Sequence, residues 1–107
     1  MVSAYSESIS MPNSLLIRNI SDLHSTITAQ LQSSNSVVLD IPSDAEADLS
    51  FVQLVESARI HAKSAGKTLT LASPAGGSVL KVLQRGGFID AFTMEDAQFW
   101  LHKEVRQ

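Results

Sequence analysis

The chain has 107 residues, a formal net charge of −3 and no cysteine. This length suits one compact domain, and a hydrophobic content of 44% is ordinary for a folded protein, which argues against disorder over most of the chain. Because the eight Lys and Arg residues are scattered, the sequence argues against a nucleic-acid-binding face and against an anionic membrane surface as a direct partner.

The first ten residues and the lengths of the apolar runs indicate the cellular compartment that we expect for this protein. The stretch MVSAYSESIS has neither a basic residue nor a long apolar run, so we expect no secretory signal. No segment approaches the roughly 20 apolar residues of a membrane-spanning helix. Since the chain also has no cysteine for disulfides, we expect a cytoplasmic protein without direct membrane insertion.

The N-terminal third predicts a tail, a strand and a helix. Residues 1–13 are rich in serine and are expected to form a flexible tail or, around Ser8–Met11, a short edge strand. The stretch Ser14–Arg18 (SLLIR) is a second strand candidate. Residues 22–33 should form a helix, because large apolar residues recur at every fourth position. These residues are Leu23, Ile27 and Leu31.

The middle of the chain predicts a buried strand and a long amphipathic helix. Ser36–Ile41 contains a continuous apolar run, Val37–Leu39, which is typical of a strand covered on both faces, and Pro42 ends it. Leu49–Ser64 has apolar residues at helical spacing. They are Phe51, Leu54, Val55, Ala58 and Ala62. Gly66 is placed to end this helix.

The last third continues the alternation. Thr68–Ala72 predicts a strand, Ser78–Gln84 a short helix, and Phe88–Phe92 a last short strand. Thr93 and the acidic residue three positions later have the spacing of a capping box, which opens a final helix to about Glu104. The side chains expected to face inward from it are Met94, Ala97, Trp100 and Leu101.

Together these elements predict an α/β sandwich. Its central sheet would be mixed but mostly parallel, with about four strands flanked by about four helices, and residues 14–107 would form a single domain. Right-handed crossovers would place the strand-to-helix turns on one edge of the sheet. The turns after Ile41 and after Ser73 should therefore lie at the same edge.

Patterns that carry chemistry in other proteins are incomplete here. Gly66-Lys67-Thr68 is similar to the end of a phosphate-binding P-loop, but His61 stands where that motif needs glycine, and the order of strand and helix is reversed. The histidines at 24, 61 and 102 lie on three predicted helices without ligand partners, and no G-x-S-x-G motif presents a nucleophile. We predict no catalytic residue, no metal site and no cofactor.

Two further polar features favour ordinary structural roles. Asp44, Glu46 and Asp48 lack the glycine and the distal glutamate of a calcium-binding loop, so they predict a solvated acidic turn. Gly76-Gly77 precedes a predicted helix and offers backbone N–H groups to an anion, although most such sequences are simple turns.

Ser50 permits two interpretations. With Gln53 it has capping-box spacing, so its hydroxyl would cap the long helix and stabilise it by about 1 kcal/mol, unless Asp48 caps the helix instead. Alternatively, Ser50 is a phosphate acceptor, because a helix N-terminus tolerates a phosphate and the added charge would change the surface that a partner meets. The residues alone favour the cap.

The order of motifs resembles the STAS domain family over about residues 15–101. The stretches that carry the resemblance are Leu39-Asp40-Ile41, Asp48-Leu49-Ser50-Phe51, Gly66-Lys67-Thr68-Leu69 and Gly86-Gly87-Phe88. That family includes anti-sigma-factor antagonists, cytoplasmic domains of sulfate transporters and a small subunit of lipid-trafficking ABC transporters. The resemblance lies in the spacing of these motifs.

The resemblance also implies a site. In the family, an Asp-Ser-Ser-Gly-like motif at the start of the second helix carries the serine that a partner kinase phosphorylates. Asp48 and Ser50 match the aspartate and the phosphorylated serine, whereas Leu49 and Phe51 replace the neighbouring serine and glycine. Because that glycine gives an enzyme close access, we expect Phe51 to crowd the approach to Ser50.

The resemblance implies a non-catalytic protein-interaction module. One function is anti-sigma-factor-antagonist-like or chemotaxis-associated partner switching in bacterial signalling, with a serine-kinase-like partner and phosphorylation at Ser50. The alternative is a constitutive subunit of a lipid-transport ABC complex. The partner-binding residues expected besides Ser50 are Asp40, Ser43, Asp48, Leu49, Phe51 and Val52. The oligomeric state is left open.

Overall fold

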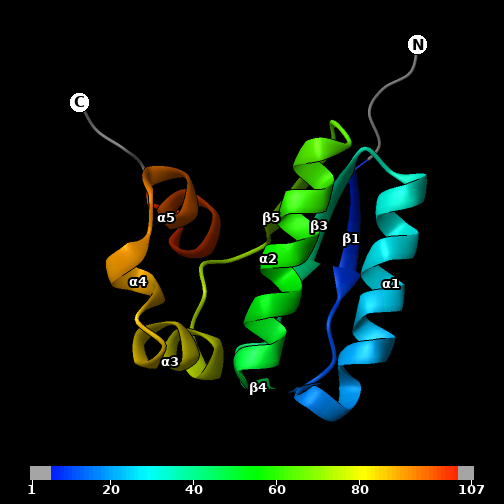
Figure 1. Ribbon diagram of the computed structural model, residues 1–107. Helices are drawn as coiled ribbons and strands as arrows, with labels where there is room; N and C mark the ends of the chain where they lie inside the picture. The colour runs from blue at the N-terminus through cyan, green and yellow to red at the C-terminus, as the bar shows by residue number, and fades with distance from the viewer. Residues whose placement is uncertain (1–5, 104–107) are drawn as a thin grey trace.

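The computed structural model describes residues 6–103, in which parallel strands and helices follow one another up to β5 and three helices complete the chain (Figure 1). No helix in this range combines the length and the apolar composition that crossing a membrane requires. In chain order, the elements are β1 (Ser6–Ser10), β2 (Ser14–Leu15), the 3₁₀ helix η1 (Ile17–Asn19), α1 (Ile20–Ser33), β3 (Ser36–Asp40), β4 (Glu46–Ala47), α2 (Leu49–Ser64), β5 (Thr68–Leu71), α3 (Gly77–Arg85), α4 (Phe88–Ala91) and α5 (Met94–Leu101).

The strands form two small sheets. The larger has the order β1-β3-β5, and the smaller pairs β2 with β4. Every pairing found within residues 6–103 is parallel. The predicted α/β class is therefore confirmed, but the sheet of about four strands is replaced by three strands and a separate pair.

The larger sheet buries only one of its faces. In one row across the strands, Ile9, Leu39 and Leu71 are paired and buried, and α1 and α2 pack over that face (Figure 1). The neighbouring row, on the opposite face, pairs Ser8, Val38 and Thr70, and both hydroxyl residues are exposed. The expectation that Val37–Leu39 is covered on both faces was wrong: Val38 is half-buried on a polar, open face.

The N-terminal residues take the second of the two structures expected of them. β1 pairs with β3 along its whole length as an edge strand, and Ile9 and Met11 belong to the core. Residues 1–5 lie outside the described range. The strand expected at Ser14–Arg18 is shorter, because the chain turns into η1 at Ile17.

The segment Phe88–Phe92 forms α4 rather than the expected strand. Phe88, Ile89 and Phe92 pack against the core, and this i, i+1, i+4 spacing fits one helical turn. In a strand, Phe88 and Phe92 would share a face with Asp90, which is exposed here. The helix thus buries the apolar residues and leaves the carboxylate in solvent.

The final helix begins as expected but turns a different face inward. The Thr93 hydroxyl accepts a hydrogen bond from the Asp96 N–H and the Asp96 carboxylate accepts one from the Thr93 N–H, both at 3.1 Å, which confirms the capping box. Trp100 is fully buried, as predicted, but Phe99 is buried and Met94 is 64% exposed. The helix therefore buries Phe99 together with Trp100 and leaves Met94 in solvent. The helix was expected to reach about Glu104 but ends at Leu101, because His102 takes a left-handed conformation with φ of +55°.

The turns after β3 and β5 meet, as the topology predicted. Gly77 adopts a left-handed conformation with φ of +52°, and a Cβ atom there would lie 2.7 Å from the Ser43 carbonyl oxygen. Only glycine fits both the backbone angle and this close approach. The contact fixes the start of α3 against the loop that leads to α2.

We expect Gly77→Ala to lower the free energy of unfolding by at least about 2 kcal/mol, because it combines left-handed strain with a clash against a backbone oxygen. Urea denaturation would measure the change. Gly76→Ser is the matched control, since a Cβ atom at Gly76 meets no heavy atom within 4 Å and serine caps helices well. Equal stability of the two variants would contradict the tight approach.

Candidate functional site

The first candidate site is the start of α2, where Asp48 and not Ser50 is the helix cap. Asp48 has extended backbone angles, and its carboxylate Oδ1 accepts a hydrogen bond from the Ser50 N–H at 3.0 Å. Ser50 is the second residue of the helix. The cap expected at Ser50 was therefore wrong and the alternative, Asp48, is confirmed, because the helix begins two residues earlier than a Ser50 cap requires.

The Asp48 carboxylate also joins two segments far apart in sequence. The Ser50 hydroxyl donates to Oδ1, and the Ile17 N–H donates to Oδ2 at 2.9 Å. The pKa of Asp48 is lower than its usual value, mainly because the Ser50 hydroxyl donates to the carboxylate. Burial raises this pKa, and hydrogen bonds from backbone N–H groups, including those of Ile17 and Ser50, lower it further. One charged group thus holds η1 to the start of α2.

Two apolar residues linked to Asp48, Ile17 through its N–H and Leu49 as the next residue in the chain, have exposed side chains. Ile17 is 70% exposed and Leu49 is 46% exposed, whereas Asp48 and Ser50 are half-buried. We call these four residues (Ile17, Asp48, Leu49 and Ser50) the α2-start surface. Ile17 was missed from the sequence because SLLIR suggested a strand, and only the long-range bond to Asp48 places it here.

The other residues expected to bind a partner divide into two groups. Asp40 at the end of β3 and Ser43 in the following loop are exposed. Phe51 and Val52 are fully buried, so their side chains face the core and are corrected from surface contacts to packing residues. Because Phe51 points inward, its side chain does not crowd Ser50, contrary to the expectation from the sequence.

The loop before α2 is held on its other side by α3. The Ser78 hydroxyl accepts a hydrogen bond from the Ala47 N–H at 3.0 Å and donates to the Ala47 carbonyl at 3.2 Å. With the Gly77–Ser43 contact, this bond ties the Gly76-Gly77 turn to the same end of the molecule as Ser50. The α2-start surface therefore lies on a braced scaffold.

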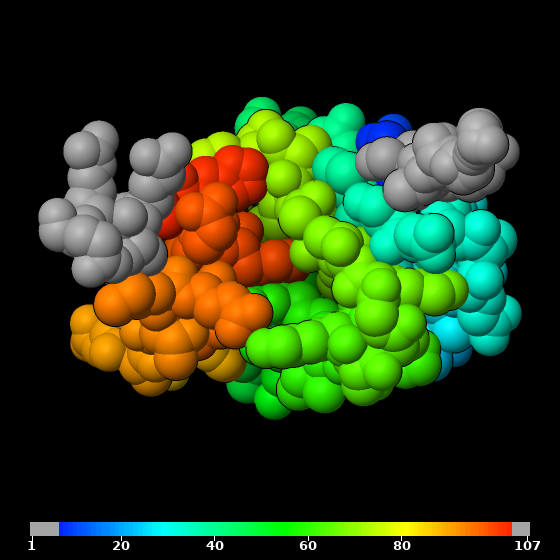
Figure 2. Space-filling view, turned by 90° about the horizontal axis from the view of Figure 1, so that it is seen from above, coloured from blue at the N-terminus to red at the C-terminus, as the bar shows by residue number. Residues whose placement is uncertain are grey.

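The second candidate site is a groove between α2 and α5, with β5 along its floor. Its cavity has a volume of about 580 Å³, which lies in the usual range for binding sites. In the space-filling view a hollow separates the red-orange α5 from the green α2 (Figure 2). Sequence reasoning did not find this groove, because it depends on how α5 packs.

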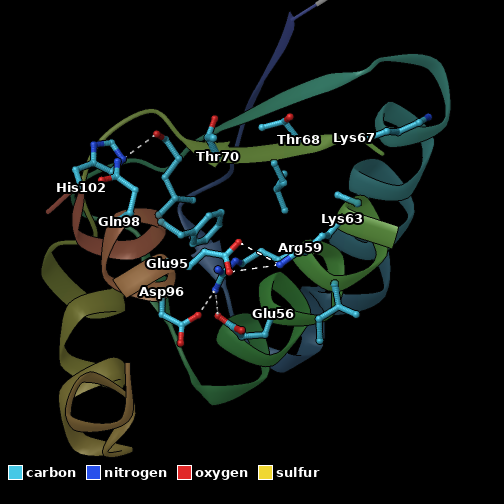
Figure 3. Close-up of a pocket in the computed structure, with 15 residues that line it drawn as sticks. Glu56, Arg59, Lys63, Lys67, Thr68, Thr70, Glu95, Asp96, Gln98 and His102 are labelled. Carbon is cyan, nitrogen blue, oxygen red and sulfur yellow. Dashed lines mark hydrogen bonds and ion pairs between the residues drawn. The ribbon is translucent and has the colours of Figure 1, made fainter. Parts of the chain in front are cut away.

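A network around Arg59 connects the two walls of the groove (Figure 3). The guanidinium Nη1 lies 2.8 Å from Glu56 Oε2 and 3.2 Å from Asp96 Oδ1, and the guanidinium carbon Cζ lies over Phe99 at 4.3 Å from the ring centre. Trp100 Nε1 donates to the same Glu56 oxygen at 2.6 Å. These contacts hold α5 beside α2.

Asp96 serves both this network and the cap of α5. Burial by itself would raise the pKa of Asp96, but the Thr93 N–H and hydroxyl and the Arg59 guanidinium together lower it below the usual value. At neutral pH the carboxylate is therefore charged. The start of α5 and its contact with α2 share this one group.

The histidines and acidic residues do not gather into a site with evident chemistry. Within residues 6–103, no three His, Cys, Asp or Glu side chains are arranged to hold a metal ion. His24 and His61 are exposed, and His102 Nε2 forms a hydrogen bond with the Leu71 carbonyl at 3.1 Å. Comparisons with protein-family models, curated proteins and solved structures give no match.

We expect Asp48→Ala to destabilise the protein by about 1–2 kcal/mol at pH 7, because the cap and the bond to Ile17 are lost. Folding lowers the pKa of Asp48, so the charged carboxylate adds to the free energy of unfolding at pH values above the unfolded pKa of about 3.9. This added stability is lost as the pH falls toward the pKa of the folded protein. Urea titrations from pH 7 to pH 2 should show that the difference in free energy of unfolding between wild type and Asp48→Ala becomes smaller. Asp44→Ala, at an exposed carboxylate in the same loop, is the control; a gap that is independent of pH would contradict this role.

We expect Phe51→Ala to cost about 3–5 kcal/mol of stability, because it empties a fully buried position. Leu49→Ala, two residues earlier and exposed, should cost less than about 1 kcal/mol. Thermal unfolding of both variants measures the difference. Similar small losses would place Phe51 on the surface after all.

Proposed function

We propose that this chain is a non-catalytic protein-interaction module of a bacterial signalling pathway. In this proposal it is a cytoplasmic, STAS-like domain that acts in partner switching of the anti-sigma-factor-antagonist or chemotaxis-associated kind. The α2-start surface, with exposed Asp40 and Ser43 nearby in the chain, meets a kinase-like protein partner. Phosphorylation at Ser50 weakens that contact.

One observation carries the proposal: the half-buried Ser50 in the first turn of α2 is hydrogen-bonded to Asp48, next to the exposed Leu49 in the chain, and Asp48 also accepts from the N–H of the exposed Ile17. Ile17 and Leu49 offer the apolar contact that interfaces bury at their centre. The inward position of Phe51 supports access to Ser50, since the large side chain that replaces the family's glycine lies in the core.

The Ser50–Asp48 hydrogen bond supplies a mechanism for a phosphate to act. A phosphorylated Ser50 has no hydroxyl proton to donate, and its negative charge would lie beside the Asp48 carboxylate. The helix N-terminus favours a phosphate, so the phosphate would compete with Asp48 for the free N–H groups. Displacing Asp48 would release its bond to Ile17, so that both the charge and the shape of the surface change.

A constitutive STAS subunit of a lipid-transport ABC complex is the second candidate. The same hydrogen bond favours it, because holding Asp48 in its capping geometry is by itself a sufficient role for Ser50. In that case the α2-start surface docks permanently on a transporter subunit. Mass spectrometry of protein purified from its native cells separates the two: phosphoserine at position 50 supports switching, and its persistent absence supports the constitutive subunit.

We expect Ser50→Asp to weaken binding of the partner recovered by pull-down at least about tenfold, which corresponds to about 1.4 kcal/mol. Isothermal titration calorimetry measures the affinity, and circular dichroism confirms that the variant is folded. Ser57→Asp, which adds the same charge at an exposed serine of the same helix, should leave the affinity unchanged. Unchanged binding by Ser50→Asp would rule out the switch.

A further inference from the structure

The outer edge of β5 carries backbone groups that point away from the sheet. The Thr68 N–H donates to the Asn35 carbonyl and the Ala72 N–H to the Leu39 carbonyl. The backbone N–H and carbonyl groups of residues 68, 70 and 72 therefore point toward β3. In a parallel ladder the backbone groups of the alternate residues, Leu69 and Leu71, then point to the outer edge of β5, away from β3. The His102 ring is the one partner that we find for this side within residues 6–103, at the Leu71 carbonyl.

This edge lies in a recess and not on an open rim. Residues of β5 line the floor of the groove, while α2 and α5 supply its walls (Figures 2 and 3). On the α2 wall, Ile60 is 70% exposed and adds apolar surface beside the strand. Within residues 6–103, we find no hydrogen-bond partner for three backbone groups on this side, the N–H and carbonyl of Leu69 and the N–H of Leu71.

The walls of the groove favour one kind of occupant. Pairing with β5 of a second copy would require two recessed edges to meet, so the α2 and α5 walls of both copies would have to pass each other. A single extended segment is narrow enough to enter. Edges of this kind bind such segments by strand addition, in which main-chain hydrogen bonds supply affinity and side-chain contacts supply specificity.

The charges of the groove argue against an anionic ligand. Its lining has three cations and three carboxylates: Arg59, Lys63, Lys67, Glu56, Glu95 and Asp96. Each cation already has a partner: Arg59 contacts Glu56 and Asp96, Lys63 Nζ lies 3.4 Å from Glu95, and Lys67 donates to the Leu31 carbonyl. A segment without strong net charge therefore fits this surface best.

We propose that the α2–α5 groove binds an extended, uncharged segment of a partner protein as a fourth strand beside β5. The two faces of the sheet set its sequence pattern, because side chains of a strand alternate between faces. Residues on the helical side contact Ile60 and Phe99 and should be apolar. Residues on the other side continue the exposed hydroxyls of Thr68 and Thr70 and should be polar.

The test uses the full-length, ¹⁵N-labelled protein and the uncharged peptide acetyl-NTVTVTVTN-amide. The control peptide, acetyl-NTTTTVVVN-amide, has the same composition without alternation. We expect saturable NMR shifts in the groove and slowed amide exchange at Leu69 and Leu71 with the first peptide only. The amides of Thr68 and Thr70, which face β3, should change less.

Two surface variants test whether the peptide binds in the groove. Ile60→Glu should weaken the peptide at least about tenfold by placing a charge against its apolar side. Met94→Glu makes the same change at an exposed residue outside the groove lining and should have no effect. The proposal is overturned by the absence of shifts at millimolar peptide, by equal binding of the two peptides, or by dimerisation that protects Leu69 and Leu71 without peptide.

Discussion

The structure depends on one constraint: a three-stranded parallel sheet that has apolar side chains on a single face. Ile9, Leu39 and Leu71 form a buried row there, and the helices α1 and α2 must both cover it. Parallel sheets are usually covered on both faces. Here the second face is polar, so no further helix layer is needed, and α3, α4 and α5 are placed to one side, beyond β5 (Figure 1). That displacement creates the groove.

Polar contacts, rather than the core alone, fix the parts that are proposed to function. Asp48 holds η1 to α2 through its two oxygens, and Arg59 holds α5 to α2 through Glu56 and Asp96. Both arrangements depend on charged carboxylates at helix starts, where backbone N–H groups are free. The two candidate sites use different parts of α2: its first turn, and the residues from Glu56 onward.

Much of the chain was predictable from local patterns. The helices expected at 22–33 and Leu49–Ser64 correspond to α1 and α2, and the helix stop at Gly66 is confirmed by its left-handed φ of +74°. Errors arose where tertiary packing decided: Phe88–Phe92 has strand-like residues, yet its apolar side chains reach the core only as a helix. Spacing also suggested Ser50 as the cap, and only the backbone angles at Asp48 show where α2 begins. No local pattern could predict the groove, because residues far apart in sequence form it.

The crossover topology also has a consequence for how the chain folds. Each strand pair of the larger sheet joins residues roughly thirty positions apart, with a helix between them. Since the strand pairs between residues 6 and 103 include no hairpin, forming this sheet requires distant segments to meet, which slows folding relative to helical bundles of the same size. During synthesis, β1 leaves the ribosome before β3, the strand with which it pairs. An apolar strand would be prone to aggregation during that delay, and the serine-rich sequence of β1 lowers this risk.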